Sequence, residues 1–239
     1  MDQITELIAE GKGKRLYATE NPDEAVVYYR DETFAFHGLK RGRIIGKGEI
    51  NNLICEYMFT LLKDKGVPNH FIRRIDNRCS LVKRVEIIPV TVKVRNIVAG
   101  SLAKRIGYPD GTKLKNTVVE HCLKDPELED PLVNLTHITA MGLATPEEIE
   151  IMSHYALRVN EILCECMREI NIELIDFKLE FGRFHGEILL ADEVSPDTCR
   201  LWDKETHEKL DKDRFRRDMG NVEDAYNEVF RRLGIEDRK

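Results

Sequence analysis

The segment that most constrains the fold is Leu174–Gly182, where apolar and charged side chains alternate. Successive side chains of a β-strand point to opposite faces, so a strand here buries one set and presents the other. Gly182–Gly186 can turn the chain back, and Glu187–Asp192 can return as the partner strand. The apolar set is Ile175, Phe177, Leu179 and Phe181, and the charged set is Asp176, Lys178 and Glu180.

The register of this hairpin predicts a metal site. A turn centred near residues 184–185 places Asp192 on the face that carries Lys178 and Glu180. Glu180 and Asp192 then become diagonal cross-strand neighbours, near enough to hold one hard cation, and Mg²⁺ is usually bound by carboxylates. The alternative is a solvated strand face with a ladder of exposed ion pairs. The acidic, turn-rich continuation Glu193–Asp197 favours the metal site.

Composition restricts the classes of partner. The chain has 239 residues, of which 42% are hydrophobic and 33% charged, as is ordinary for a soluble globular protein. The net charge of −6 argues against a nucleic-acid partner. No apolar stretch has membrane-spanning length, and the N-terminus lacks the features of a signal peptide. The six cysteines show no metal-ligand spacing. We therefore expect a cytoplasmic protein with no membrane partner.

The first third of the chain is predicted to be β-rich, with one helix. That helix follows from apolar residues at helical spacing between Ile50 and Leu62, and Gly66 and Pro68 supply its stop. Short runs of strand-forming residues lie on both sides of it. The predicted strands are residues 14–19, 25–29, 71–75 and 80–85.

The rest of the chain mixes strands and helices. Val90–Val98 alternates as a half-buried strand does. Thr145 and Glu148 form a capping-box pattern that begins a long helix, and a final helix runs from Asn221 to Gly234.

This order of elements predicts an α+β fold with two lobes. We place the boundary at residues 86–89. The lobes are residues 1–86, β-rich with a nucleotide-binding turn, and 87–239, mixed α/β with the metal and substrate site.

Two further segments can bind anions. In the first, Gly11 and Gly13 let backbone N–H groups approach a phosphate, and Lys12 and Lys14 can neutralise its charge. It is not a Walker A loop, and a basic N-terminal turn is the alternative.

The second segment is Arg95–Arg105, read as a strand, a glycine, Ser101 as N-cap and a short helix. Free N–H groups at a helix start attract anions, and Arg95 can bind a carboxylate or phosphate with two hydrogen bonds. The alternative is a capped helix with solvated basic residues. Together, the anion-binding segments and the paired carboxylates favour a nucleotide and a second, phosphorylated or carboxylated, substrate.

Nearly end to end, these segments resemble the family of SAICAR synthetases, the phosphoribosylaminoimidazole-succinocarboxamide synthases of purine synthesis. The Asp-Phe-Lys-Leu-Glu-Phe-Gly and Asp-Glu-Val-Ser-Pro-Asp runs are the most specific part of the match. The matching segments are Glu10–Tyr17, Lys47–Asn52, Val94–Ser101, Asp130–Asn134, Ile175–Gly182, Ala191–Asp197, Arg200–Asp203 and Asp211–Arg216.

The resemblance implies a two-lobed fold distantly like that of protein kinases, with ATP in the cleft between lobes. By the same resemblance, Glu180 and Asp192 would hold Mg²⁺. The implied nucleotide-binding residues are Gly11, Lys12, Lys14, Leu16, Lys83, Val85 and Glu86. The implied residues of the carboxyaminoimidazole ribotide (CAIR) site are Arg95, Ser101, Asp176, Asp197 and Arg200. The segment Thr33–Gly38 departs from the family pattern, which leaves the role of His37 open.

The implied reaction joins L-aspartate to CAIR. ATP converts the carboxylate of CAIR to an acyl phosphate, and the aspartate amine then displaces phosphate. Lys12, Lys14 and Lys178 are the predicted catalytic residues, Lys178 as a charged group, because flanking carboxylates favour its protonated form. The family also suggests a homodimer. The alternatives are a kinase-like phosphotransferase, for which no His-Arg-Asp loop is present, and a non-catalytic nucleotide-binding module.

Overall fold

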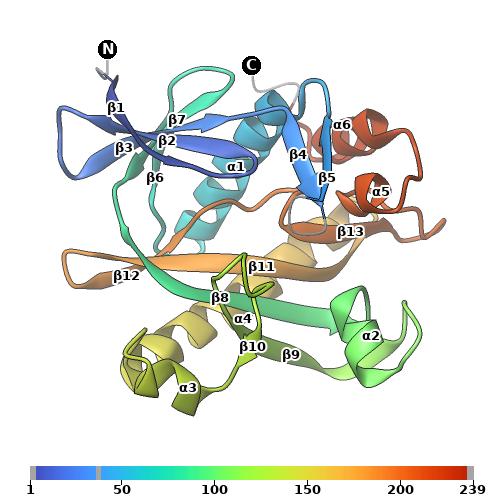
Figure 1. The fold of residues 1–239 in the computed structure, drawn as a ribbon. Coiled ribbons are helices and arrows are strands. Elements are labelled where there is room, and N and C mark those ends of the chain that lie inside the picture. The colour runs from blue at the N-terminus through green and yellow to red at the C-terminus, as the bar shows by residue number, and fades with distance from the viewer. Residues whose placement is uncertain (1–3, 36–38, 236–239) are drawn as a thin grey trace.

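The computed structural model describes residues 4–35 and 39–235, which form two large antiparallel sheets and one two-stranded sheet, with helices packed against the large sheets (Figure 1). The N-terminal sheet has the strand order β1-β2-β3-β7-β6. Its strands are β1 (Ile4–Glu10), β2 (Lys14–Thr19), β3 (Glu24–Tyr29), β6 (Phe71–Arg74) and β7 (Cys79–Lys83). The predicted strands of this region are confirmed.

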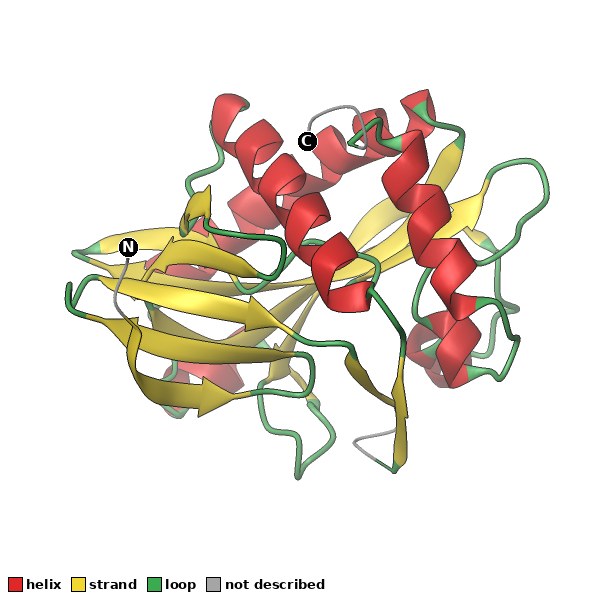
Figure 2. Ribbon diagram, turned by 90° about the horizontal axis from the view of Figure 1, so that it is seen from above, coloured by secondary structure: helices red, strands yellow, loops and turns green. Residues whose placement is uncertain are grey.

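Two further elements complete the N-terminal part. The strands β4 (Glu32–Ala35) and β5 (Lys40–Arg43) form a separate hairpin. Helix α1 (Lys47–Asp64) packs its apolar residues against the N-terminal sheet, as its spacing predicts, and Gly66 follows its end with a φ of 86°. Figure 2 shows the helices lying against the strands when the molecule is turned by 90°.

The second sheet has the order β10-β9-β8-β11-β12, with β13 also paired to β11. The long strand β11 lies beside β8 on one edge, and on the other edge beside β13 and then β12. The strands are β8 (Glu86–Ile97), β9 (Lys113–Leu123), β10 (Leu132–Val133), β11 (Ile172–Phe184), β12 (Glu187–Ala191) and β13 (Cys199–Asp203). The helices of this part are α2 (Ser101–Ile106), α3 (Leu135–Ala140), α4 (Pro146–Glu169), α5 (Asp213–Arg216) and α6 (Val222–Arg232).

Helix α4 covers β8 and β11 with the apolar stripe that the sequence predicts. Its capping box is confirmed: the Thr145 side chain accepts from the Glu148 N–H at 3.2 Å, and the Thr145 N–H donates to Glu148 Oε2 at 2.9 Å. Most buried apolar side chains of α1, α4, β8 and β11 belong to one hydrophobic core, while Ile97 of β8 and Ile175 of β11 form a smaller cluster with Ala99 and Trp202. The alternating apolar set of β11, from Ile175 to Phe181, is buried as predicted.

The chain passes from one sheet to the other between Lys83 and Glu86. A second connection joins the sheets through backbone hydrogen bonds, with the Leu190 N–H donating to Pro68 O at 3.0 Å and the His70 N–H donating to Leu190 O at 2.9 Å. The division into lobes 1–86 and 87–239 stays a prediction. Among the described residues, no helix is long and apolar enough to cross a membrane.

The hairpin of β11 and β12 is confirmed, but the predicted register was wrong by one residue. Phe184 pairs with Glu187, which leaves His185 and Gly186 as a two-residue turn with φ values of 49° and 85°. Glu180 therefore pairs with Ala191, and regular pairing would put Asp192 on the core face. Asp192 instead follows the strand with a φ of 62°, and this left-handed turn brings its carboxylate to the charged face.

Ser101 is not the N-cap of its helix. Gly100 occupies that position with a φ of 57°, and α2 begins at Ser101. The Ser101 hydroxyl instead accepts a hydrogen bond from Arg95 Nη2 at 3.0 Å. Gly100 is required for a second reason, because a Cβ there would lie 2.5 Å from Arg200 Nη2.

Candidate active site

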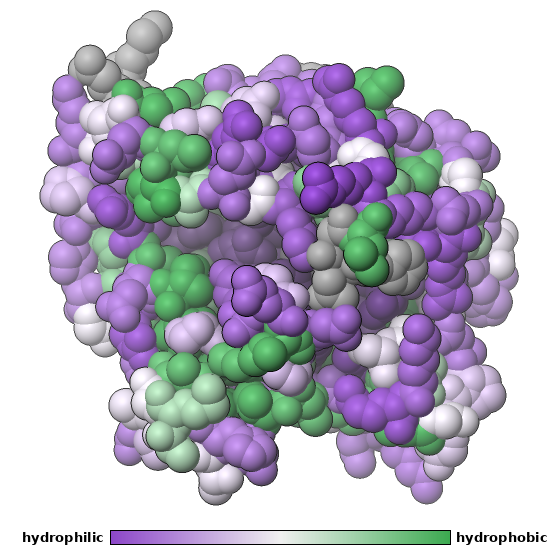
Figure 3. Space-filling view, in the orientation of Figure 1, coloured by the Kyte–Doolittle hydropathy of each residue, from purple (hydrophilic) through white to green (hydrophobic). Residues whose placement is uncertain are grey.

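On the face shown in Figure 3, the molecule is hollowed between the two sheets, with hydrophilic side chains around the hollow. A cavity of about 310 Å³ is formed largely by residues of β8, β11 and β13 and the segment before β13. The structure brings the predicted substrate residues together in its wall, along with Lys178. They are Arg95, Ser101, Asp176, Asp197 and Arg200.

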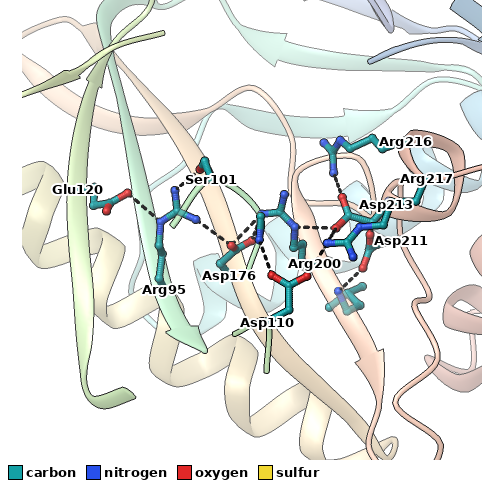
Figure 4. Close-up of polar contacts among 12 residues, drawn as sticks. Arg95, Ser101, Asp110, Glu120, Asp176, Arg200, Asp211, Asp213, Arg216 and Arg217 are labelled. Carbon is teal, nitrogen blue, oxygen red and sulfur yellow. Dashed lines mark hydrogen bonds and ion pairs between the residues drawn. The ribbon is translucent and has the colours of Figure 1, made fainter. Parts of the chain in front are cut away.

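Two arginines converge on Asp176 in this cavity (Figure 4). Arg95 Nη1 donates to Asp176 Oδ2 at 3.0 Å, and Arg200 Nη1 donates to the same carboxylate at 2.8 Å. Arg95 Nε also donates to Glu120 Oε2 at 2.7 Å, and Arg200 Nε donates to Asp213 Oδ2 at 2.9 Å. Buried carboxylates thus hold both guanidinium groups in fixed orientations.

The charge on Arg200 is secured by its neighbours. Burial disfavours the charged form, but Asp176 and Asp213 outweigh it and raise the pKa of Arg200. Burial likewise opposes ionisation of Asp213, while Arg200 and Arg216 lower its pKa to about 2. Arg200 and Asp213 are therefore charged at neutral pH.

The glycine-rich turn brings Lys14 to the second sheet. Its ammonium contacts the Asp192 carboxylate and lies 3.3 Å from Glu193 Oε2. Burial disfavours the charge on Lys14, but Asp192 and Glu193 outweigh it and raise its pKa. Lys12, in the same turn, is exposed.

Lys178 bridges the two predicted metal ligands. Its Nζ lies 3.1 Å from Glu180 Oε1 and 3.8 Å from Asp192 Oδ2. Burial opposes its charge, but both carboxylates raise its pKa. Burial also opposes ionisation of Asp192, whereas Lys14 and Lys178 hold its pKa well below the usual range.

Glu180 and Asp192 fit a magnesium ion whose other coordination positions are filled by water and by a bound ligand. Within the described residues, no three His, Cys, Asp or Glu side chains are gathered for a metal. Magnesium commonly takes one or two protein carboxylates, with water and phosphate oxygens filling the other positions. The Glu180 and Asp192 carboxylates lie around one ammonium group, that of Lys178, and so supply two negative charges to the same small region.

Three of the predicted nucleotide-binding residues, Lys83, Val85 and Glu86, lie at the crossing between the sheets. Lys83 ends β7, with its Nζ 5.3 Å from the Phe184 ring centroid, and Glu86 begins β8. Val85 packs against Gly182, where a Cβ would lie 2.5 Å from Val85 Cγ2. Leu16 is half-buried on β2. His37 and Gly38 lie outside the described residues.

Sequence reasoning missed several charged residues of the site. Lys124 Nζ lies 2.6 Å from Glu180 Oε2. Asp197 contacts Lys47 Nζ at 3.0 Å and Lys212 Nζ at 3.5 Å, and it accepts a hydrogen bond from the Tyr226 hydroxyl at 2.5 Å. Lys47 and Lys212 belong to segments that carry the family resemblance, which is the signal that could have identified them.

Comparisons with known proteins identify the family. The SAICAR synthetase family model matches residues 7–233. Phosphoribosylaminoimidazole-succinocarboxamide synthase of Lachnoclostridium phytofermentans is 54% identical, over 97% of this chain and 98% of the relative. The enzyme of the same name from Brevibacillus brevis is 55% identical, over 96% of both chains.

Solved structures extend the similarity to the fold. The crystal structure of phosphoribosylaminoimidazole-succinocarboxamide synthase from Ehrlichia chaffeensis has a TM-score of 0.94 and 43% identity, covering 96% of this chain and 99% of that one. A SAICAR synthetase in complex with ADP has a TM-score of 0.92 and 41% identity, covering 94% and 96%. The chain therefore belongs to the SAICAR synthetase family of ATP-dependent ligases.

Proposed function

We propose that this chain joins L-aspartate to the carboxylate of CAIR, consuming ATP and producing SAICAR, ADP and phosphate. The observation that carries the proposal is the arrangement of charge along β11. Asp176, Lys178 and Glu180 occupy successive outward positions of this strand. Four residues of a strand span roughly 14 Å, so an arginine-lined site and a phosphoryl site lie side by side.

Arg95 and Arg200 bind the ribotide in this proposal, with Ser101 beside them and Asp176 holding both guanidiniums in place. Asp197 takes a positioning role, because its carboxylate is already held by Lys47 and Tyr226. Fixed charged groups of this kind orient a substrate without rearranging when it binds.

The reaction must first activate a carboxylate, which is a poor electrophile. Transfer of the γ-phosphoryl group of ATP to the CAIR carboxylate leaves ADP and forms an acyl phosphate. The aspartate amine attacks the acyl carbon, loses a proton and expels phosphate as the amide forms. Lys14 and Lys178 stabilise the negative charge on the phosphoryl group, with the exposed Lys12 at the entrance of the turn.

The nucleotide lies between the sheets in this proposal, under Gly11 and beside Leu16, Lys83, Val85 and Glu86. Glu180 and Asp192 hold Mg²⁺, which when bound offsets the charge of the phosphates. Lys14 and Lys178, which contact these carboxylates here, then turn toward the phosphate oxygens. The resemblance to the family supports a cytoplasmic homodimer, and light scattering after size-exclusion chromatography tests the dimer.

An assay of phosphate release tests the function. The full chain is given ATP and Mg²⁺, with CAIR and aspartate added separately and together. Release that needs both substrates, with equal amounts of SAICAR and phosphate formed, supports the ligase. Stable phosphorylation of CAIR that proceeds unchanged without aspartate would identify a phosphotransferase, and ADP binding without turnover would identify a nucleotide-binding module.

A further inference from the structure

A second cavity lies on the N-terminal sheet, outside the site described above. Its volume is about 280 Å³. Its charged lining comes from β2, the end of β3, the hairpin of β4 and β5, and the turn between β6 and β7. The charged lining residues are Arg15, Arg30, Arg43, Arg78, Asp31 and Glu32.

Strand alternation separates this cavity from the active site. On β2, Lys14 pairs with Tyr29 of β3, and Arg15 pairs with Tyr28. Tyr29 is buried in the hydrophobic core, so Lys14 and Tyr29 share the inner face of the sheet. Arg15 and Tyr28, one residue along on each strand, therefore share the outer face.

Positive charge exceeds negative charge in this cavity. Four guanidinium groups face two lining carboxylates, and Glu10 at the rim contacts Arg15 and Arg30. Arg43 is held loosely: its side chain is 71% exposed, and its Nη2 lies 3.6 Å from Asp31 Oδ2, beyond a good hydrogen bond. A local excess of cations on a chain with a net charge of −6 favours an anionic ligand.

The same residues are joined to the active site through the backbone. The Arg30 N–H donates to the carbonyl of Gly13, in the glycine-rich turn, at 2.8 Å. Asp31 Oδ1 accepts from the Gly48 N–H at 3.0 Å, next to Lys47, which reaches Asp197. A ligand that pulls on Arg30 or Asp31 therefore acts on the turn and on the start of α1.

We propose that this outer pocket, lined by Arg15, Arg30, Arg43 and Arg78, binds a small phosphate-bearing anion and tightens the glycine-rich turn when occupied. Guanidinium groups match phosphate oxygens with paired hydrogen bonds, and every lining residue except Tyr28 is charged, which disfavours a larger hydrophobic ligand. Free phosphate and the phosphoryl groups of a nucleotide share this chemistry. The effect on the turn rests on the proposed function, whereas binding to the pocket does not.

Equilibrium dialysis of the full chain with ADP and radiolabelled inorganic phosphate tests the binding. One ADP plus one phosphate per chain supports a site for free phosphate. Two ADP per chain support a site for nucleotide phosphates. In either case, Arg43→Gln lowers the affinity for the second ligand by about tenfold, because one charge-assisted hydrogen bond is lost. The affinity for the first ADP is unchanged. The matched control Arg158→Gln, on the exposed side of α4, changes neither.

One ADP and no phosphate per chain would overturn the proposal, and so would a second ligand bound equally well by Arg43→Gln. Hydrogen exchange tests the connection to the active site. In ADP-saturated protein, saturating phosphate, or further ADP if that is the second ligand, slows exchange of the amides in residues 11–14. Arg43→Gln loses this effect. Binding without slower exchange would confine the proposal to the pocket and refute the coupling.

Discussion

The ammonium of Lys47 lies 3.0 Å from Asp197 Oδ2, and the two side chains are only 1% and 6% exposed. Lys47 begins α1, while Asp197 lies in the segment between β12 and β13. A Cβ at Gly13 would lie 3.4 Å from Lys47 Nζ and 3.6 Å from Asp197 Oδ2. The ion pair of Lys47 and Asp197 therefore packs against the glycine-rich turn and supports it.

Replacing Lys47 with Met is expected to destabilise the fold and lower activity. The change leaves the buried Asp197 with Lys212 and Tyr226 as its remaining partners. Breaking a buried ion pair costs about 3–5 kcal/mol, and Lys212 keeps the expected loss near the lower end. Urea unfolding measures it, with Lys65→Met, at a 47% exposed side chain, as the control. A loss no larger than that of the control would contradict the supporting role.

Glu180→Gln is expected to lower the rate of SAICAR formation by roughly 10²–10³-fold, because the site loses a charge that holds the phosphoryl group's counter-ion. The variant should also need a higher Mg²⁺ concentration for half-maximal activity, and this increase is the specific sign of a lost metal ligand. Glu173→Gln is the matched control, since Glu173 lies on the same strand and pairs with Lys113. Unchanged turnover and Mg²⁺ dependence in Glu180→Gln would refute the metal assignment.

Gly182→Ala is expected to strain the crossing between the sheets. The added Cβ would lie 2.5 Å from Val85 Cγ2 and 3.0 Å from Glu86 O. Overpacking of this kind costs about 1–3 kcal/mol. Thermal or urea unfolding measures the loss, and ADP affinity should fall with it if Val85 contacts the nucleotide. Adding Val85→Ala removes the nearest atom, Cγ2, but leaves Cβ at 2.7 Å, so it should recover part of the stability; failure to recover any would place the strain at the contacts that remain.

Glu148 provides a test by pH. Its hydrogen bonds with Arg183, opposed by burial, lower its pKa from 4.5. A carboxyl whose pKa is lowered on folding stabilises the protein above its unfolded pKa, and this stability is lost as the pH falls through the folded value. Glu148→Gln should therefore cost about 1–2 kcal/mol at neutral pH and progressively less below pH 4.5. The exposed neighbour Glu147→Gln should show neither effect, and a pH-independent cost would contradict the account.

Much of the fold was predictable because local rules govern it. Alternation identified β11, and the capping box of Thr145 and Glu148 placed the start of α4. The substrate residues were implied by the family resemblance, whereas strand alternation alone placed only Arg95 and Asp176 on the polar faces of their strands.

What the sequence did not predict depends on single residues and on distant contacts. The register of the β11–β12 hairpin was missed because moving its turn by one residue changes every cross-strand pair. The carboxylate of Asp192 reaches the charged face only because Asp192 has a left-handed φ. Pairs such as Lys124 with Glu180, or Lys47 with Asp197, join residues 56 and 150 positions apart in the chain. No periodicity in the sequence encodes a contact of that range.

The double-sided pairing of β11 makes the length of this strand harder to change than its composition. Inserting or deleting one residue between Asp176 and Glu180 would invert every later side chain, sending Glu180 into the core and Phe181 to the charged face. The irregularities that β11 already has, between Leu174 and Asp176 and between Glu180 and Gly182, lie at the two ends of this stretch, so a further change within it would disrupt regular pairing with the neighbouring strands. The strand therefore tolerates a change of one side chain more readily than a change of its length by one residue.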